Sequence, residues 1–392
     1  MSSVRLTAKG RRWMQGGHPW IYRDDLSAAE AEAGDLVALE DPQGALVGWG
    51  SYSAASRIAV RIVTREKAEP GPAFWEERVA RARAVRERLG LADPQGAERL
   101  VAGDADGIPG LVVDRYASVL VVQSGTHFAE RIAPAVLSAL RAGLGAPVSC
   151  VVERSDAGVR KLEGLEPRAG VLEGALPELL LVREQELVYE VDVLTGHKTG
   201  HYLDQRENRR RAAELARGRS VLDVFSYDGL FGVRAALGGA ERVLCLDQSA
   251  AALERARRNA ERNGVAQRFA TERVDALDDL RARAGRGERF GLVIVDPPAF
   301  ARNRAQIEGA ARGYVELNRR ALELVEPLGH LVSASCSYNV RAWEFVDFLA
   351  QAAVAARRTA WLEELRGAAA DHPHLLTLPE THYLKCAFVR VG

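Results

Sequence analysis

Five residues in the C-terminal half combine reactive side chains with matching positions along the chain. Asp223, Asp247, Asp275 and Asp296 each lie at or near the end of a short apolar run, and Cys336 follows another, in SASCS. A carboxylate can accept hydrogen bonds from hydroxyl, ammonium or amino groups, and a thiolate can attack an electron-poor carbon. If the five runs are neighbouring parallel strands, their ends share the sheet edge where α/β proteins bind ligands.

The segments between these residues predict the sheet that would bring them together. From residue 220 onward, apolar runs typical of strands alternate with helical patterns. The predicted strands are 220–225, 242–247, 268–274, 292–296, 330–335 and 385–391, and the predicted helices are 230–237, 249–263, 276–284, 309–325 and 341–356. This alternation predicts a doubly wound α/β fold with a parallel sheet.

The turn YDGLFG follows the first predicted strand, where such a fold binds a nucleotide-like ligand. The dinucleotide fingerprint GxGxxG, whose glycines let a pyrophosphate approach the backbone, is absent. S-adenosylmethionine has no pyrophosphate, so the single Gly229 suffices for it. Asp247 follows Asp223 by 24 positions, close to the offset of about 20 residues for an acid that binds ribose hydroxyls. The sequence therefore predicts S-adenosylmethionine as the cofactor and ranks NAD below it.

The predicted cofactor site combines this turn with the ends of the following strands. Asp275, at the end of the third strand, is expected to accept a hydrogen bond from the adenine amino group. The alternative is that strand-end acids merely cap helices. The predicted cofactor contacts are Asp223, Phe225, Ser226, Tyr227, Gly229, Asp247, Gln248, Asp275, Ala276 and Asp296.

The four cysteines differ in their settings. Cys150, Cys245 and Cys386 lie inside strand patterns, which predicts core packing. Cys336 follows its strand between two small serines, so we predict an accessible nucleophile. Thiolate attack on carbon 6 of cytosine makes carbon 5 nucleophilic, and Asp296 is the candidate acid near ring nitrogen 3. The alternative for Cys336 is an inert cysteine at a strand end.

The tripeptide Asp296-Pro297-Pro298 should end the fourth strand, because two prolines cannot continue a central strand. The turn would expose a carboxylate and carbonyl groups, which suits a flat base that carries an amino group. It therefore also fits methylation of an exocyclic amino group held beside Phe300, a reaction that gives Cys336 no role. An RNA-binding assembly factor that has lost the reaction is the alternative of another class, and the intact acids argue against it.

The first half of the chain predicts two further modules. Strand-like runs at 36–39, 45–49 and 58–63 indicate a small β-rich domain over 1–70, which ends at a Pro-Gly break. A helix at 74–89, strands at 110–114, 119–123 and 149–153, and a helix at 130–144 predict a central α+β domain over 71–186. The remaining 187–392 would form the cofactor domain. Trp20, Tyr22 and Trp49 are predicted to be core residues rather than base-stacking platforms.

Composition limits the partners and the location. Lys+Arg and Asp+Glu are both 53, so RNA attraction would have to come from local basic surfaces. No signal peptide and no apolar run of about 18 residues is present, which predicts a soluble, cytoplasmic protein. Without CxxC or HExxH spacing, no metal site is predicted.

With these motifs in view, the sequence resembles the ribosomal RNA large subunit methyltransferase I family, bacterial enzymes that form 5-methylcytosine in 23S rRNA. The matching pieces span nearly the whole chain: GHPWIYRDDL, GHKTGHYLDQRENR at 196–209, LDVFSYDGLFG, DPPAF, SASCS, DHP at 371–373 and PETHYLK at 379–385. The resemblance implies an RNA-binding PUA β-barrel, a central α+β domain and a class I, Rossmann-like methyltransferase domain. The implied partner is 23S rRNA or a large-subunit assembly intermediate, and a homodimer is left open.

The resemblance also implies roles for single residues. Tyr202, Gln205 and Arg206 should lie over the cofactor, and Cys336 should be the nucleophile. Other cytosine-5 RNA methyltransferases carry a second cysteine after the strand-four proline, whereas this chain has Ala299 there. Another base must then complete product release. Arg206 is followed by Arg209, Arg210 and Arg211. A solvated helix face and contacts with RNA phosphates would explain these three arginines equally well.

Overall fold

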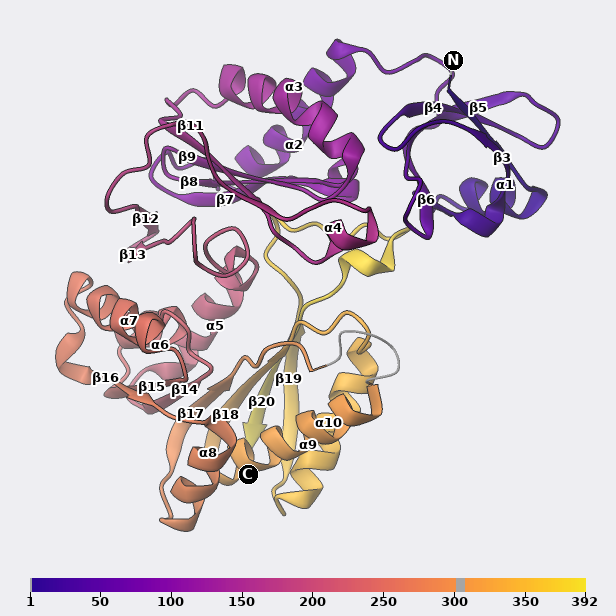
Figure 1. Cartoon of the computed structure of the whole chain (residues 1–392). Helices are drawn as coiled ribbons and strands as arrows, with labels where there is room; N and C mark the ends of the chain where they lie inside the picture. The colour runs from indigo at the N-terminus through magenta and orange to yellow at the C-terminus, as the bar shows by residue number, and fades with distance from the viewer. Residues whose placement is uncertain (1, 301–306) are drawn as a thin grey trace. The chain divides into compact units, whose positions relative to one another are not determined.

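The computed structural model describes residues 2–300 and 307–392, which form two compact units (Figure 1). The first unit holds the chain up to Arg183 together with Val191–Leu203 and Ala370–Thr381. The second unit holds Glu184–Glu190, Asp204–Ala369 and His382–Gly392. The first unit contains two separate sheets with two separate apolar cores. On this basis we propose that residues 1–70 and 71–186 form two domains.

The N-terminal sheet has six strands in the order β2-β6-β5-β4-β1-β3. The predicted runs at 36–39, 45–49 and 58–63 are confirmed as β4, β5 and β6. Helix α1 (Ala8–Gln15) begins where the Thr7 hydroxyl accepts a hydrogen bond from the Gly10 amide at 3.0 Å. Trp49 is buried as predicted, whereas Trp20 and Tyr22 are only partly buried. The strands are β1 (Ser3–Leu6), β2 (Trp20–Tyr22), β3 (Leu26–Glu30), β4 (Leu36–Glu40), β5 (Leu46–Tyr52) and β6 (Ile58–Thr64).

The second sheet has the order β11-β10-β9-β8-β7, and helices α2 and α3 pack on it around one core (Figure 1). The predicted elements at 74–89, 110–114, 119–123, 130–144 and 149–153 are confirmed as α2, β8, β9, α3 and β10. The elements are α2 (Pro72–Arg88), β7 (Ala97–Ala102), β8 (Leu111–Tyr116), β9 (Val119–Ser124), α3 (His127–Gly143), β10 (Cys150–Ser155), α4 (Val159–Leu162) and β11 (Arg168–Gly174).

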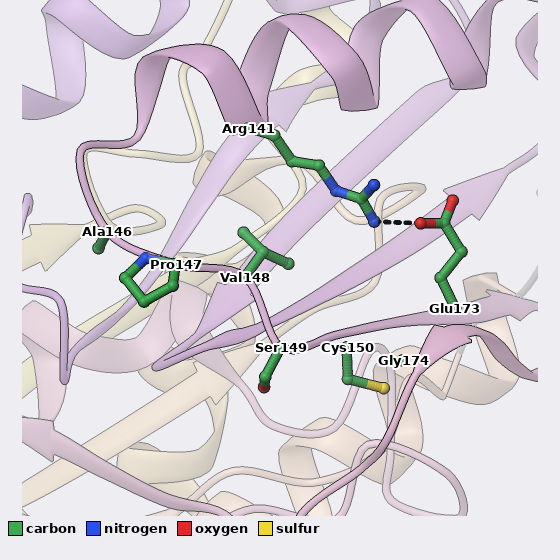
Figure 2. Close-up of a pocket in the computed structure, with 8 residues that line it drawn as sticks. All are labelled: Arg141, Ala146, Pro147, Val148, Ser149, Cys150, Glu173 and Gly174. Carbon is green, nitrogen blue, oxygen red and sulfur yellow. Dashed lines mark hydrogen bonds and ion pairs between the residues drawn. The ribbon is translucent and has the colours of Figure 1, made fainter.

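A pocket of about 290 Å³ lies beside the start of β10. Arg141 of α3 and Glu173 of β11 form an ion pair there, and Cys150 lines the pocket (Figure 2). Burial raises the pKa of the Cys150 thiol. Cys150 is therefore a packing residue, as its strand pattern predicts.

The second unit contains a seven-stranded sheet in the order β16-β15-β14-β17-β18-β20-β19. Strands β14 to β18 are parallel, and β20 runs antiparallel to both of its neighbours. The prediction of an all-parallel sheet was therefore wrong for β20, and β19 was missed. The strands are β14 (Ser220–Val224), β15 (Arg242–Asp247), β16 (Phe269–Arg273), β17 (Phe290–Val295), β18 (Val325–Ser335), β19 (Ala360–Arg366) and β20 (Lys385–Val391).

Helices follow the parallel strands as the periodicity predicts. Chain order reverses between β14 and β17, and ligands of doubly wound sheets bind in the crevice outside the strand ends at such a switch point. Among the described residues, no helix is long and apolar enough to cross a membrane. The helices are α5 (Arg206–Ala216), α6 (Leu230–Leu237), α7 (Ala250–Arg262), α8 (Ala276–Gly285), α9 (Ile307–Glu323) and α10 (Ala342–Ala355), and β12 (Leu181–Glu184) pairs with β13 (Leu187–Glu190).

Candidate active site at the carboxyl ends of the sheet

The turn between β14 and α6 has a strained backbone. Phe225, Tyr227 and Gly229 have φ angles of 62°, 51° and 74°, in the left-handed region that favours glycine. Two of these three residues carry side chains, so the surrounding structure must hold the turn in place. Such strain occurs mostly at functional sites.

Hydrogen bonds to β15 hold this turn. The Ser226 amide donates to the Leu246 carbonyl at 3.0 Å, and the Tyr227 amide donates to the Asp247 carboxylate at 2.9 Å. The other Asp247 oxygen accepts from the Ser249 amide at 2.8 Å. Asp247 therefore joins the turn to the start of α7, which sequence reasoning did not foresee.

Asp223 is buried near the end of β14. Its carboxyl oxygen accepts from the Gly232 amide at 3.0 Å and from the Cys245 thiol at 3.7 Å. Burial, and secondarily the negative charge of Asp296, raises the pKa of Asp223 to about 8. The carboxyl group is therefore protonated at neutral pH unless a cation lies beside it.

A bound cation should release this proton. At pH 7 the pKa of Asp223 lies above the pH, and the ammonium of a sulfonium amino acid would lower it, so binding should expel up to about one proton. The release should fall to about half near pH 8 and vanish well above it, where Asp223 is already ionised. Calorimetry in two buffers of different ionisation heat measures it. Binding heats that do not depend on the buffer, or equal release in Asp223→Asn, would contradict this prediction.

Asp275 caps α8, so the alternative of a helix cap is realised at this position. One carboxylate oxygen accepts from the amides of Leu277 and Asp278 at 3.1 and 3.3 Å. The other accepts from the Gln248 side chain at 2.8 Å, which links the ends of β15 and β16. Ala276, the first residue of α8, is buried. The contact between Asp275 and adenine stays a prediction.

Replacing Asp247 with alanine should weaken S-adenosylmethionine binding about tenfold or more. The variant would lose a charge-assisted hydrogen-bond pair to the ribose, worth roughly 1.5 to 3 kcal/mol, as well as the acceptor of the Tyr227 amide. Titration calorimetry measures the affinity. Asp278→Ala removes an exposed carboxylate from α8 and serves as the control. If Asp247→Ala binds S-adenosylmethionine as tightly as this control, Asp247 does not contact the cofactor.

Asp296 follows β17 and contacts a residue that the resemblance also placed in the site. The buried Gln205 side chain donates to the Asp296 carboxylate at 2.9 Å. Asn208, one turn further along α5, donates to the Gln205 carbonyl oxygen at 2.7 Å and to the Gly367 carbonyl at 3.1 Å. The amide of Gln205 is thereby oriented toward Asp296. Asn208 was missed, although it lies in the same DQREN motif.

The arginines of α5 have structural partners. Arg209 is buried and paired with Glu184 at 2.7 Å, so neither a solvated face nor a phosphate contact explains it. Arg211 pairs with Glu364 at 2.5 Å, and the exposed Arg210 lies 3.9 Å from Glu214. The buried Arg206 begins the helix.

Tyr202 belongs to the first unit. There its hydroxyl is hydrogen-bonded to His197 at 3.0 Å, and the Lys198 ammonium lies 4.5 Å from the centre of its ring. The contact of Tyr202 with the cofactor therefore stays a prediction.

Cys336 is partly exposed just after β18, the neighbour of β17 in the sheet. The flanking Ser335 and Ser337 are buried, and both are hydrogen-bonded to the hydroxyl of the buried Tyr314, at 2.8 and 2.9 Å. The ring of Phe300, from the DPPAF motif, lies 4.7 Å from the Tyr314 ring. Tyr314 therefore connects the loops after β17 and β18, and no pattern in the sequence indicated this role.

The placement of the other cysteines is confirmed. Cys245 and Cys386 are completely buried, and burial raises the pKa of each thiol well above its ordinary value. Cys336 is thus the accessible cysteine. Within the part of the chain that the structure describes, no group of three or more His, Cys, Asp or Glu side chains could hold a metal ion.

Comparisons with known proteins match two parts of the chain. Residues 4–65 match a PUA-like domain, and residues 165–371 match an S-adenosylmethionine-dependent methyltransferase model. Two relatives, both ribosomal RNA large subunit methyltransferase I, are from Shewanella denitrificans and Erwinia tasmaniensis. They are 38% and 39% identical over 394 and 396 residues, and each alignment covers at least 99% of both chains.

Solved structures resemble the whole chain. A methyltransferase in complex with SAH superposes with a TM-score of 0.86 at 20% identity and full coverage of both chains. A methyltransferase from Streptococcus mutans gives a TM-score of 0.84 at 19% identity, again with full coverage. At this identity the likeness shows the fold.

Proposed function

Because this chain belongs to the ribosomal RNA large subunit methyltransferase I family and depends on S-adenosylmethionine, we propose that it methylates carbon 5 of a cytosine in 23S rRNA. One observation carries the choice of carbon 5: the accessible Cys336 follows β18, and β18 is the neighbour of β17, which Asp296 follows. Methylation of an amino group needs no such thiol.

The donor set of the site fits S-adenosylmethionine. Asp247 offers carboxylate oxygens beside the turn after β14, and Asp223 is a buried acid that a neighbouring cation would ionise. Gly229 leaves the last position of the turn, just before α6, without a side chain. When bound, S-adenosylmethionine supplies a methyl group on a positively charged sulfur.

In the proposed reaction, the Cys336 thiolate adds to carbon 6 of cytosine, and Asp296 donates a proton to ring nitrogen 3. A sulfur–carbon bond forms while the double bond between carbons 5 and 6 is lost, which makes carbon 5 nucleophilic. Carbon 5 takes the methyl group, and the electron pair of the broken bond stays on the cofactor sulfur. A base then removes the carbon 5 proton, the thiolate leaves as the double bond returns, and the proton on ring nitrogen 3 goes back to the Asp296 carboxylate.

Nucleoside mass spectrometry tests the proposal. 23S rRNA from a strain without the gene should gain 5-methylcytosine when it is incubated with the protein and S-adenosylmethionine. N4-methylcytosine instead would favour the amino-group reaction at the DPPAF turn. Cofactor binding without any methylation, on naked RNA or on assembling subunits, would favour an assembly factor.

We also propose that α1 recruits the RNA. The Arg11 and Arg12 side chains have no ion-pair or hydrogen-bond partner among the described residues, and Trp13 is 42% exposed. The Trp13 indole donates to the Trp20 carbonyl at 2.9 Å, which fixes its ring, and the His18 ring lies 4.8 Å away. Cations suit phosphates, and a fixed aromatic ring suits a base. A pocket of about 390 Å³ is lined by Lys9, Arg12, Trp13, Gly16, His18, Leu376, Thr377 and Pro379.

Replacing Arg11 and Arg12 of α1 with alanine should weaken RNA binding. The slope of log affinity against log salt concentration should fall by the contribution of up to about two phosphate contacts. Trp13→Ala should cost roughly 1 to 3 kcal/mol by removing one stacked base. Filter binding at several salt concentrations measures both effects. A variant that removes Arg81 and Arg88 from α2 provides the same charge loss elsewhere. Equal effects of the two double variants would refute a role of α1, and cofactor affinity should not change.

A further inference from the structure

Lys385 is a buried lysine beside the loop that carries Cys336. It pairs with Ser335 across β18 and β20 and is 1% exposed. Its ammonium donates to the carbonyl of Ser337 at 2.6 Å and to that of Tyr383 at 2.9 Å. Of the two sequence neighbours of Cys336, Ser337 therefore accepts a hydrogen bond from the Lys385 ammonium, and Ser335 lies opposite Lys385 in the sheet.

The positive charge of the Lys385 ammonium has no ion-pair partner among the described residues. The ammonium has three donors, of which two are used on carbonyl groups, and no carboxylate among the described residues forms an ion pair with it. Burying a charge without a partner is costly. Burial lowers the pKa of Lys385 to about 8, and the acidic groups that counteract this are Cys336 and Glu344. Because a buried cation without an ion-pair partner lowers stability, we expect Lys385 to have a functional role.

We propose that Lys385 is a positioning residue for the methyl transfer, whose buried positive charge stabilises the thiolate of Cys336. The inference rests on the proposed nucleophilic role of Cys336. A nearby cation favours the thiolate, the reactive form of cysteine. The other ionisable groups around this loop are Tyr314 on α9, Arg341 and Glu344 at the start of α10, and Asp296 after β17. Arg341 is exposed, so Lys385 is the buried cation among these groups.

The charge of Lys385 is separable from the hydrogen bonds that shape the loop. Tyr314→Phe removes the hydroxyl that holds Ser335 and Ser337 but leaves the charge. Lys385→Gln keeps hydrogen-bond donors near the two carbonyl groups but removes the charge, and Lys385→Met removes both. A purely structural role would be filled at least partly by glutamine, whereas an electrostatic role would not.

The pH dependence of Cys336 alkylation by iodoacetamide tests the proposal in the full chain, with the modified peptide quantified by mass spectrometry. Cys150, Cys245 and Cys386 are buried, so the native protein reports on Cys336. Both Lys385 variants should raise the pKa of the Cys336 thiol by about one unit, which lowers the alkylation rate at pH 7 by up to about tenfold. Tyr314→Phe should leave the midpoint of the profile near that of the parent.

Two results would overturn the inference: an unchanged midpoint in Lys385→Gln or Lys385→Met, or an equal shift in Tyr314→Phe. S-adenosylmethionine binding and thermal unfolding identify which variants are folded, and either folded lysine variant decides the question. Failure of the proposed function gives a different result. If Cys336→Ala keeps full methylation, the thiol is not the nucleophile, yet the alkylation profile still reports whether Lys385 stabilises its thiolate.

Discussion

Replacing Cys336 with alanine should lower the rate of methyl transfer at least about 1,000-fold and leave S-adenosylmethionine affinity nearly unchanged. Carbon 5 of cytosine is a poor nucleophile until a group adds to carbon 6, and the variant has no thiol to add. Cys336 follows β18, whereas the candidate cofactor turn follows β14. Single-turnover methylation of 23S rRNA and calorimetry with the cofactor measure the two quantities.

Cys386→Ala is the matched control, because it removes a buried thiol from the neighbouring strand β20. It should reduce the free energy of unfolding while methyl transfer continues. Full methylation in Cys336→Ala would exclude the thiolate mechanism and leave the amino-group reaction as the better account of the DPPAF turn.

Replacing Gly229 with alanine should reduce the free energy of unfolding of the second unit by about 2 to 5 kcal/mol and abolish tight cofactor binding. The φ angle of 74° is costly for a residue with a side chain, by roughly 1 to 2 kcal/mol. An added Cβ would lie 2.7 Å from the Ala256 Cβ on α7 and 3.0 Å from the Phe269 ring on β16. Such overpacking costs typically about 1 to 3 kcal/mol.

Gly218 separates these two causes. Its φ angle is 68°, but an added Cβ would have no neighbouring atom within 4 Å. Gly218→Ala should therefore cost only the conformational part, about 1 to 2 kcal/mol, and leave cofactor affinity intact. Denaturant unfolding of both variants measures the difference. Equal losses would show that packing against α7 and β16 contributes nothing.

Buried elements were the predictable part of the fold. Strands such as β14, β15 and β17 consist mostly of apolar residues, so their positions follow from the sequence, and the α/β fold of the second unit is confirmed. Strand β19 was missed because most of its residues are exposed and three of its seven are charged. The antiparallel β20 has the same apolar pattern as a parallel strand, so its direction could not be read from composition.

The candidate site was predictable where strand ends define it. Sheet topology brings Asp223, Asp247 and Asp296 to one edge, and the exposure of Cys336 follows from its place after β18. Asn208 and Tyr314 were not predictable, because they lie on helices whose contacts with the loops depend on packing between segments far apart in the sequence. Lys385 lies in a motif that was noticed, but only the pairing of β20 with β18 places it beside Cys336.

The central claim, a covalent bond between Cys336 and the target cytosine, is tested most directly with RNA that carries 5-fluorocytosine. Fluorine cannot leave carbon 5 as a proton does, so the methylated intermediate should stay attached to the enzyme. Incubation with this RNA and S-adenosylmethionine should give a complex that survives denaturant, with the nucleotide mapped to the Cys336 peptide by mass spectrometry. Two results would contradict the account. The first is that the enzyme methylates the matching unsubstituted RNA but forms no stable complex with the 5-fluorocytosine RNA. The second is that Cys336→Ala forms as much complex as the parent protein.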